Sequence, residues 1–311
     1  MPISIGIDYA PPRWSCCLAD DETIIERNAF KSAAALLRHL AQLCSLYPEA
    51  VLMLALPLEI ERQTLHDYLL RTQAVSAVKD EQLPLFLAAI SEFSQQIHLV
   101  PAVQHLPHIP AHRPLMRPTL GASTTFCMLV SLVYFMRQQE ADWTEMNFSL
   151  LSLSATSYTL LVVKNGRVVD GTGERLLQRA SEQTERAIIQ QAIIEQLAYD
   201  LAGIMSVHQL EDVVLLVHPE VSATDESEEG QAEGEGQEEQ DQLDQSYQEK
   251  IINHFSDLYQ FFLYPMSEKS VAGFEAAQGA ALLAQGLGTS GPAVELSRYL
   301  FPSSSSRARA I

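Results

Sequence analysis

The chain has 311 residues, 47% of them hydrophobic, and a formal net charge of −19 at pH 7. The segment from Asp225 to Asp244 holds ten acidic residues and no basic one, so removing its charge leaves −9 for the rest. The length suits two domains that each bury a core. The acidic balance argues against a nucleic-acid-binding surface and against attraction to anionic lipid.

The cysteines and the apolar stretches indicate a cytoplasmic protein. Cys16, Cys17, Cys44 and Cys127 form no C-x-x-C pair, and we expect them to be reduced. The start of the chain lacks the basic and apolar regions of a signal peptide. The most apolar stretch, residues 126–136, is shorter than the roughly 20 residues that span a bilayer.

The first part of the chain predicts alternating strands and helices. Residues 3–27 indicate three antiparallel strands, and the spacing over 30–46 indicates a helix. The apolar run 51–56 predicts a strand that is buried on both faces. A helix over 82–96 and a strand over 97–100 follow, and the four prolines of 105–118 predict an irregular connector.

The second part repeats this order. A helix is expected over 121–138, with Ser123 or Thr124 as its cap. A second three-strand unit begins near Met146, and Lys164-Asn165-Gly166 is typical of a type I′ hairpin turn. A helix over 180–205 and an apolar strand over 213–217 complete the repeat. We therefore expect an internal duplication.

The remaining segments are one polar tract and two helical patterns. The tract 223–245 consists mainly of Glu, Gln, Gly and Asp, which predicts a disordered loop, either a solvated spacer or the binding site of a protein partner. Helical patterning is present over 247–263 and 274–287. The last residues, 303–311, are expected to fray.

Together these elements predict an α/β fold with two domains around a cleft, residues 1–118 and 119–311. In each domain a three-stranded antiparallel meander is extended by parallel strands and flanked by helices. The C-terminal helix is expected to pack back on the first domain.

Three passages resemble the superfamily of acetate and sugar kinases, heat-shock chaperone ATPases and actin, and within it a family of butyrate-kinase-like proteins. They are Ile5-Gly6-Ile7-Asp8, similar to the first phosphate motif; residues 151–171, similar to the second phosphate hairpin; and residues 272–287, similar to the adenosine-side helix. Residues 112–127 resemble the interdomain segment.

The resemblance implies two ribonuclease-H-like domains with ATP and Mg²⁺ between them. Asp8 would be the catalytic residue, whose carboxylate holds Mg²⁺ through water or orients the acceptor. The phosphate side would include Ser154, Thr156, Gly171 and Gly173, and the adenosine side Gly273 and Gly279. The alternatives are that Asp8 caps a turn, that Gly171 and Gly173 shape one, and that Gly273 and Gly279 permit close helix packing.

The chain departs from the family pattern at three places. Tyr9-Ala10-Pro11-Pro12 follows Asp8, and proline offers no N–H to a phosphate. Residues 154–156 lack the usual acid and glycine. Gly121-Ala122-Ser123-Thr124-Thr125 replaces a segment that carries an acid and a base in the family. Because phosphoryl transfer depends on positioning and charge compensation, these departures indicate weak or absent catalysis.

Two functions follow as hypotheses. The first is a binding or scaffold protein with a degenerate nucleotide site and little or no phosphotransferase activity. The alternative is an active ATP-dependent kinase of a small carboxylate or sugar. A homodimer is compatible with either, and no further cofactor is expected. His105, His108 and His112 have metal-like spacing, but their proline-rich surroundings argue against a metal site.

Overall fold

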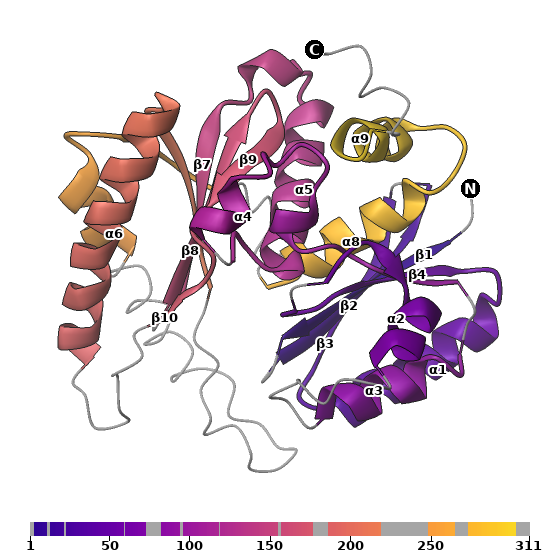
Figure 1. Ribbon diagram of the computed structural model, residues 1–311. Coiled ribbons are helices and arrows are strands. Elements are labelled where there is room, and N and C mark those ends of the chain that lie inside the picture. Colours follow the sequence, from indigo (N-terminus) through magenta and orange to yellow (C-terminus); the bar gives the residue numbers. More distant parts are fainter. Residues whose placement is uncertain are drawn as a thin grey trace. The chain divides into compact units, whose positions relative to one another are not determined.

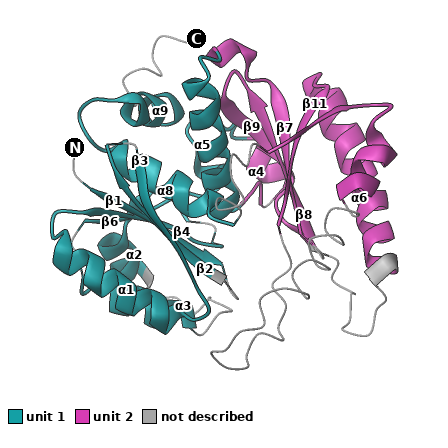
Figure 2. Ribbon diagram, turned by 180° about the vertical axis from the view of Figure 1, so that it is seen from behind, with its two compact units in different colours: residues 1–111, 122–141, 268–311 teal, residues 112–121, 142–267 magenta. Residues whose placement is uncertain are grey.

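A computed structural model describes residues 3–10, 13–21, 23–58, 60–72, 82–93, 96–117, 119–154, 157–176, 186–218, 248–264 and 273–302. The chain forms two compact units, shown in Figure 2. Unit 1 combines Met1–Ala111, Ala122–Ala141 and Glu268–Ile311, and unit 2 combines His112–Gly121 and Asp142–Ser267.

Unit 1 is built on a six-stranded sheet in the order β3-β2-β1-β4-β6-β5. Its strands are β1 (Ser4–Ala10), β2 (Arg13–Asp20), β3 (Thr23–Phe30), β4 (Val51–Ala55), β5 (Gln63–Thr64) and β6 (Ile97–Leu99). The first three form an antiparallel meander, whereas β4 runs parallel to β1 and β6 runs parallel to β4. All five residues of β4 are buried, as the unbroken apolar run predicts.

Helices cover both faces of this sheet (Figure 1). On one face lie α1 (Ala33–Leu46), α2 (Leu65–Thr72) and α3 (Gln82–Ile90), and on the other α8 (Glu275–Gln285). The helices α5 (Ser123–Gln138) and α9 (Pro292–Leu300) pack mainly against α8. The main core lies between the sheet and α1 and α3, where Leu36, Leu40 and Phe86 are buried. On the other face, Ala277 and Ala281 of α8 pack against Cys17 and Ala19 of β2.

Unit 2 repeats the same sheet order. Its strands are β7 (Phe148–Leu153), β8 (Ser157–Lys164), β9 (Arg167–Gly171), β10 (Arg175–Leu176), β11 (Asp212–Val217) and β12 (Gln260–Leu263). The order is β10-β8-β7-β11-β12, with β9 also paired to β8. As in unit 1, an antiparallel meander is followed by parallel strands, here β11 beside β7 and β12 beside β11.

The α-helices of unit 2 in the described residues are α4 (Arg113–Met116), α6 (Arg186–His208) and the helical residues 248–255, and a short 3-10 helix covers Trp143–Glu145. Ile193, Leu197 and Leu201 of α6 are buried against the sheet. None of the helices in the described ranges combines the length and the apolarity that crossing a bilayer requires.

The repeated sheet order confirms the predicted fold class, two ribonuclease-H-like α/β modules. The hairpin turn is confirmed as well, since Asn165 and Gly166 both have positive φ, at 49° and 70°. The helix predicted over 82–96 ends at Ile90. The helical prediction over 247–263 is wrong at its end, where residues 260–263 pair with β11 as a strand.

The two units are groups of residues that pack together in space, and each combines segments from both sides of residue 118, where the sequence predicts a division. The helix α5 and the C-terminal helices group with unit 1. The domain boundaries 1–118 and 119–311, which the repeated order of elements in the sequence suggests, stay a prediction. The predicted acidic loop 223–245 and the predicted frayed end 303–311 lie outside the described residues.

Candidate functional site

Asp8 is a buried carboxylate near the carboxyl end of β1. It pairs in register with Ser15 of β2 and Ala55 of β4, and only 7% of its surface is exposed. Burial raises the pKa of the Cys127 thiol well above its usual range, and the charge of Asp8 raises it further. Asp8 therefore lies near the first part of α5, where Cys127 is found.

Glu275 is a second buried carboxylate of unit 1, in the first turn of α8 and 1% exposed. Its Oε2 atom accepts a hydrogen bond from the backbone N–H of Gly273, at 2.9 Å. Gly273 adopts a φ of +82°, a conformation that glycine permits at little cost. This turn points the acid back toward the start of its own helix, where the helix dipole stabilises negative charge.

Asp8 and Glu275 share a neighbour, the thiol of Cys17 on β2. The pKa of Cys17 is raised to about 12, mainly by burial; the charge of Arg27 opposes the shift, and those of Asp8 and Glu275 add to it. The charges of two buried carboxylates therefore raise the pKa of the same buried thiol in unit 1. Sequence reasoning identified Asp8 and missed Glu275, because an acid in the first turn of a helix is also an ordinary feature of exposed helices.

The two acids provide the oxygen ligands that Mg²⁺ prefers. Across the described ranges, no three His, Cys, Asp or Glu side chains gather closely enough to hold a metal ion by themselves. A hard cation bound here would keep several waters and take further oxygens from a phosphate, as Mg²⁺ commonly does. The donor set thus fits Mg²⁺ that arrives with a nucleotide and does not fit a permanently held metal.

Gly279 lies inside α8, where it allows α5 to approach closely. A Cβ at this position would lie 1.9 Å from the carbonyl oxygen of Cys127. The main chain of α5 at Cys127 therefore fills the space that a side chain at position 279 would need. A contact of Gly273 or Gly279 with adenosine stays a prediction.

In unit 2, Ser154 closes the turn between β7 and β8. Its N–H donates to the carbonyl of Ser157, and its Oγ lies 2.8 Å from the Ser157 Oγ. Thr156, the other predicted phosphate ligand of this turn, lies outside the described residues. The hydroxyl of Ser157 in turn donates to Glu174.

Next to this turn, Ser152 and His218 bring together the ends of two parallel strands. The Ser152 Oγ is 2.7 Å from the His218 Nε2, and the N–H of His218 donates to the carbonyl of Leu153. Burial lowers the pKa of His218 to about 4, so the imidazole is neutral at pH 7. The pair is distant in the sequence and was not predicted, since no local pattern links a residue of β7 to one that follows β11.

Gly171 and Gly173 lie beneath the connector that precedes α5. A Cβ on Gly171 would lie 2.0 Å from the carbonyl oxygen of Leu120, and one on Gly173 would lie 2.0 Å from the hydroxyl of Thr119. Arg117 donates a hydrogen bond to the carbonyl of Gly171, at 3.0 Å. These contacts give both glycines a packing role, and their proximity to phosphate stays a prediction.

The adjacent Asp170 is 2% exposed and fully engaged within unit 2. Its Oδ2 lies 2.8 Å from Arg113 and 2.9 Å from the Nε2 of His208, while its Oδ1 accepts from the N–H of Gly171. Both oxygens therefore have partners, and Asp170 ties the connector and the end of α6 to β9. This is the arrangement of a structural ion pair.

Comparison with known proteins gives the family and several solved structures of similar arrangement. The sequence model of the family described as "Protein of unknown function (DUF1464)" matches residues 32–305, and the chain belongs to this family. No curated protein matches the chain.

Three of the similar solved structures are a ROK family protein, an acetate kinase and a ROK hexokinase. A ROK family protein from Streptococcus pneumoniae, in complex with sucrose, has a TM-score of 0.46 at 11% identity, covering 91% of this chain and 98% of its own. An acetate kinase from Entamoeba histolytica has a TM-score of 0.42 at 9% sequence identity, covering 70% of this chain and 82% of its own. A ROK hexokinase from Thermus thermophilus has a TM-score of 0.41 at 10% sequence identity, covering 90% of this chain and 97% of its own. At these levels of similarity we base the fold on the sheet order alone.

Proposed function

We propose that this member of the DUF1464 family binds a nucleotide together with Mg²⁺ through unit 1 and transfers phosphoryl groups weakly or not at all. Its role would then be that of a binding or scaffold protein. The observation that carries the proposal is the pair of buried carboxylates, Asp8 on β1 and Glu275 at the start of α8.

Asp8 and Glu275 are both buried and their charges act on the same thiol, Cys17, and a bound cation favours the charged form of such carboxylates. Asp8 also lies at the carboxyl end of the parallel strands β1 and β4, the edge of an open α/β sheet where ligands commonly bind. A hydrated Mg²⁺ held by Asp8 and Glu275 would neutralise the phosphates of a bound nucleotide.

The segment at the start of α5 supports weak catalysis. The resemblance implies an acid and a base there, but Thr124 and Thr125 stand at those two positions. The preceding Ser123 is fully buried and bound to the main chain of unit 1. Its Oγ accepts from the N–H of Leu56 at 2.7 Å and donates to the carbonyl of Leu56 at 2.6 Å. This hydroxyl is therefore already hydrogen-bonded to the main chain, both as acceptor and as donor. With Pro11 and Pro12 after Asp8, few groups are left to compensate charge on a transferring phosphoryl group.

Calorimetric titration with Mg-ATP and Mg-ADP tests the proposal directly. We expect saturable binding that EDTA weakens and that Asp8→Asn and Glu275→Gln each weaken at least about tenfold, since each removes a charged ligand. The matched control is Asp67→Asn, which makes the same change at an exposed acid of α2. Thermal unfolding of each variant shows whether it remains folded.

Two outcomes would overturn parts of the proposal. If no nucleotide binds at millimolar concentration, or if Asp8→Asn binds as tightly as Asp67→Asn, the nucleotide site is wrong. Rapid turnover of ATP with acetate, butyrate or a sugar would instead support the active kinase that the sequence leaves as the alternative. A cytoplasmic location, a homodimer and a protein partner of the tract 223–245 stay predictions.

A further inference from the structure

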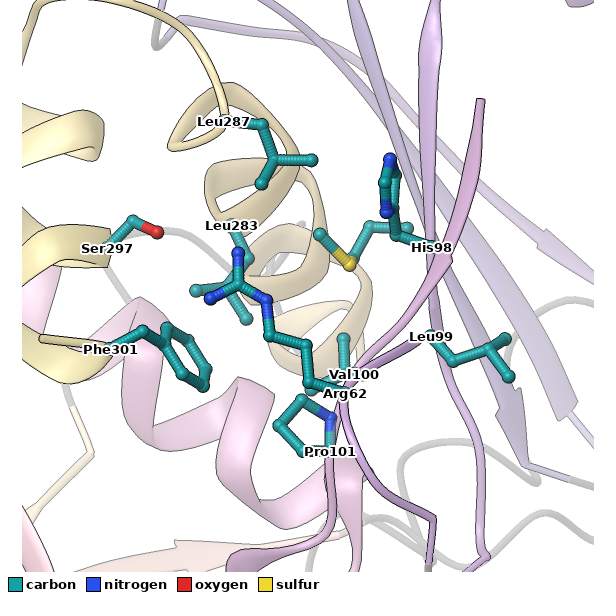
Figure 3. A pocket seen from close by; sticks show the side chains of 10 residues that line it. Arg62, His98, Leu99, Val100, Pro101, Leu283, Leu287, Ser297 and Phe301 are labelled. Atoms are coloured by element: carbon teal, nitrogen blue, oxygen red, sulfur yellow. The ribbon is translucent and has the colours of Figure 1, made fainter. Parts of the chain in front are cut away.

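A small pocket opens in unit 1 beside the C-terminal half of α8 (Figure 3). Its walls come from β4, β6, α8 and α9, and the segment before β5 closes it. The lining side chains that matter here are Met53, Arg62, His98, Leu283, Ser297 and Phe301. Leu283 is two turns of helix from Glu275, about 12 Å along the axis, so this pocket is separate from the pair of acids.

Arg62 provides the charge of the pocket. Its guanidinium carbon lies 4.4 Å from the centre of the Phe301 ring, a cation–π arrangement that fixes its position. In Figure 3 the guanidinium extends between Phe301, Leu283 and Ser297. Among the residues that the structure describes, no carboxylate lies within ion-pair distance of Arg62.

His98 is the other ionisable group of the pocket. Burial lowers the pKa of this histidine, and the charge of Arg62 lowers it further. Burial also lowers the pKa of Arg62, although an arginine stays charged at any physiological pH. The pocket therefore holds one positive charge, a neutral imidazole and the hydroxyl of Ser297, with no acid to balance the charge.

We propose that this pocket binds a singly charged oxyanion group, with Arg62 as the main donor and Ser297 as a second donor. The planar guanidinium offers paired N–H groups that match two oxygens of one anion. The space inside is about 10 Å³, room for roughly one water, so one oxygen of the anion enters while the rest of the ligand lies at the pocket mouth, where Arg62 is exposed.

Charge and polarity select the anion. One guanidinium balances one negative charge, whereas a dianion would leave an uncompensated charge beside Met53, Leu283 and Phe301, which is costly in apolar surroundings. A carboxylate group meets this requirement best, because it carries one charge and its two oxygens fit the guanidinium. The proposal does not depend on nucleotide binding at Asp8.

The test is calorimetric titration of the full chain with sodium acetate, phosphate and sulfate at constant ionic strength and pH 8, without nucleotide. We expect saturable acetate binding that Arg62→Gln weakens about tenfold or more and Arg62→Lys weakens less. Arg71→Gln is the matched control, since it removes the same charge from an exposed residue of α2. Acetate should also raise the melting temperature of the wild type and of this control, and not that of Arg62→Gln.

A second variant keeps the test valid if Arg62→Gln does not fold. Phe301→Leu retains the charge but removes the ring on which the guanidinium stacks, so acetate binding should weaken severalfold. Equal acetate affinity in wild type and Arg62→Gln would overturn the proposal. Tighter binding of sulfate or of the phosphate dianion than of acetate would overturn the argument for a singly charged ligand.

Discussion

Replacing Gly6 of β1 with alanine is predicted to destabilise unit 1 strongly. The added Cβ would lie 2.0 Å from the carbonyl oxygen of Ala277 and 2.2 Å from the backbone nitrogen of Ala281, both in α8. Residues four apart in a helix share a hydrogen bond, so the methyl group would occupy the place of one. The oxygen lies about 1.4 Å inside the 3.4 Å at which ordinary contact begins, and only a shift of the helix or strand backbone relieves the overlap.

We therefore expect Gly6→Ala to cost about 3 kcal/mol or more, at or above the upper end of overpacking effects. The matched control is Gly203→Ala in α6, where a Cβ meets nothing within 4 Å and the residue is exposed. There the same change should stabilise by about 0.5–1 kcal/mol, because alanine is the better helix former.

Urea unfolding measures both changes. The chain has two tryptophans, and Trp14 lies in unit 1 whereas Trp143 lies in unit 2. In a Trp143→Phe background, fluorescence follows Trp14 and therefore Gly6→Ala in unit 1, whereas in a Trp14→Phe background it follows Trp143 and therefore the control in unit 2. If Gly6→Ala unfolds within about 0.5 kcal/mol of the wild type, the close packing of β1 against α8 is wrong.

Three further predictions concern single side chains. Asp170→Asn should destabilise unit 2 by about 3 kcal/mol in urea unfolding, because it removes the buried partner of Arg113; a change below 1 kcal/mol would contradict this. The folded pKa of His218, about 4, lies below that of an unfolded histidine, so stability should fall as pH drops from about 6.5 to 4, and His218→Gln should flatten that slope in unfolding measured across pH. Iodoacetamide at pH 8 should label the half-buried Cys44 first, and mass spectrometry that finds another cysteine labelled first would refute this.

The fold was predictable because its strongest signals are local. The unbroken apolar run that becomes β4 and the Asn165-Gly166 turn each specify one backbone arrangement through their own residues. The strand β12 was not predictable in this way. Phe262 and Leu263 are 44% and 56% exposed, and pairing with β11, rather than an apolar pattern, makes the segment a strand.

The candidate site was predictable only in part, for the same reason. Asp8 ends an apolar strand, which any reader of the sequence can notice. Glu275 becomes notable only when its burial and its shared neighbour Cys17 are known, and both depend on how α8 packs on β2. The contact of Ser152 with His218 joins residues 66 positions apart, and no single sequence displays it.

The packing of α8 on β1 also has a consequence for synthesis on the ribosome. The sheet of unit 1 begins at Ser4, but the helix that covers Gly6 ends only at Gln285. At about 5–20 residues per second, a nascent chain waits on the order of ten seconds or more between making the two. During that interval one face of the first sheet lacks its cover, while the whole of unit 2 is synthesised.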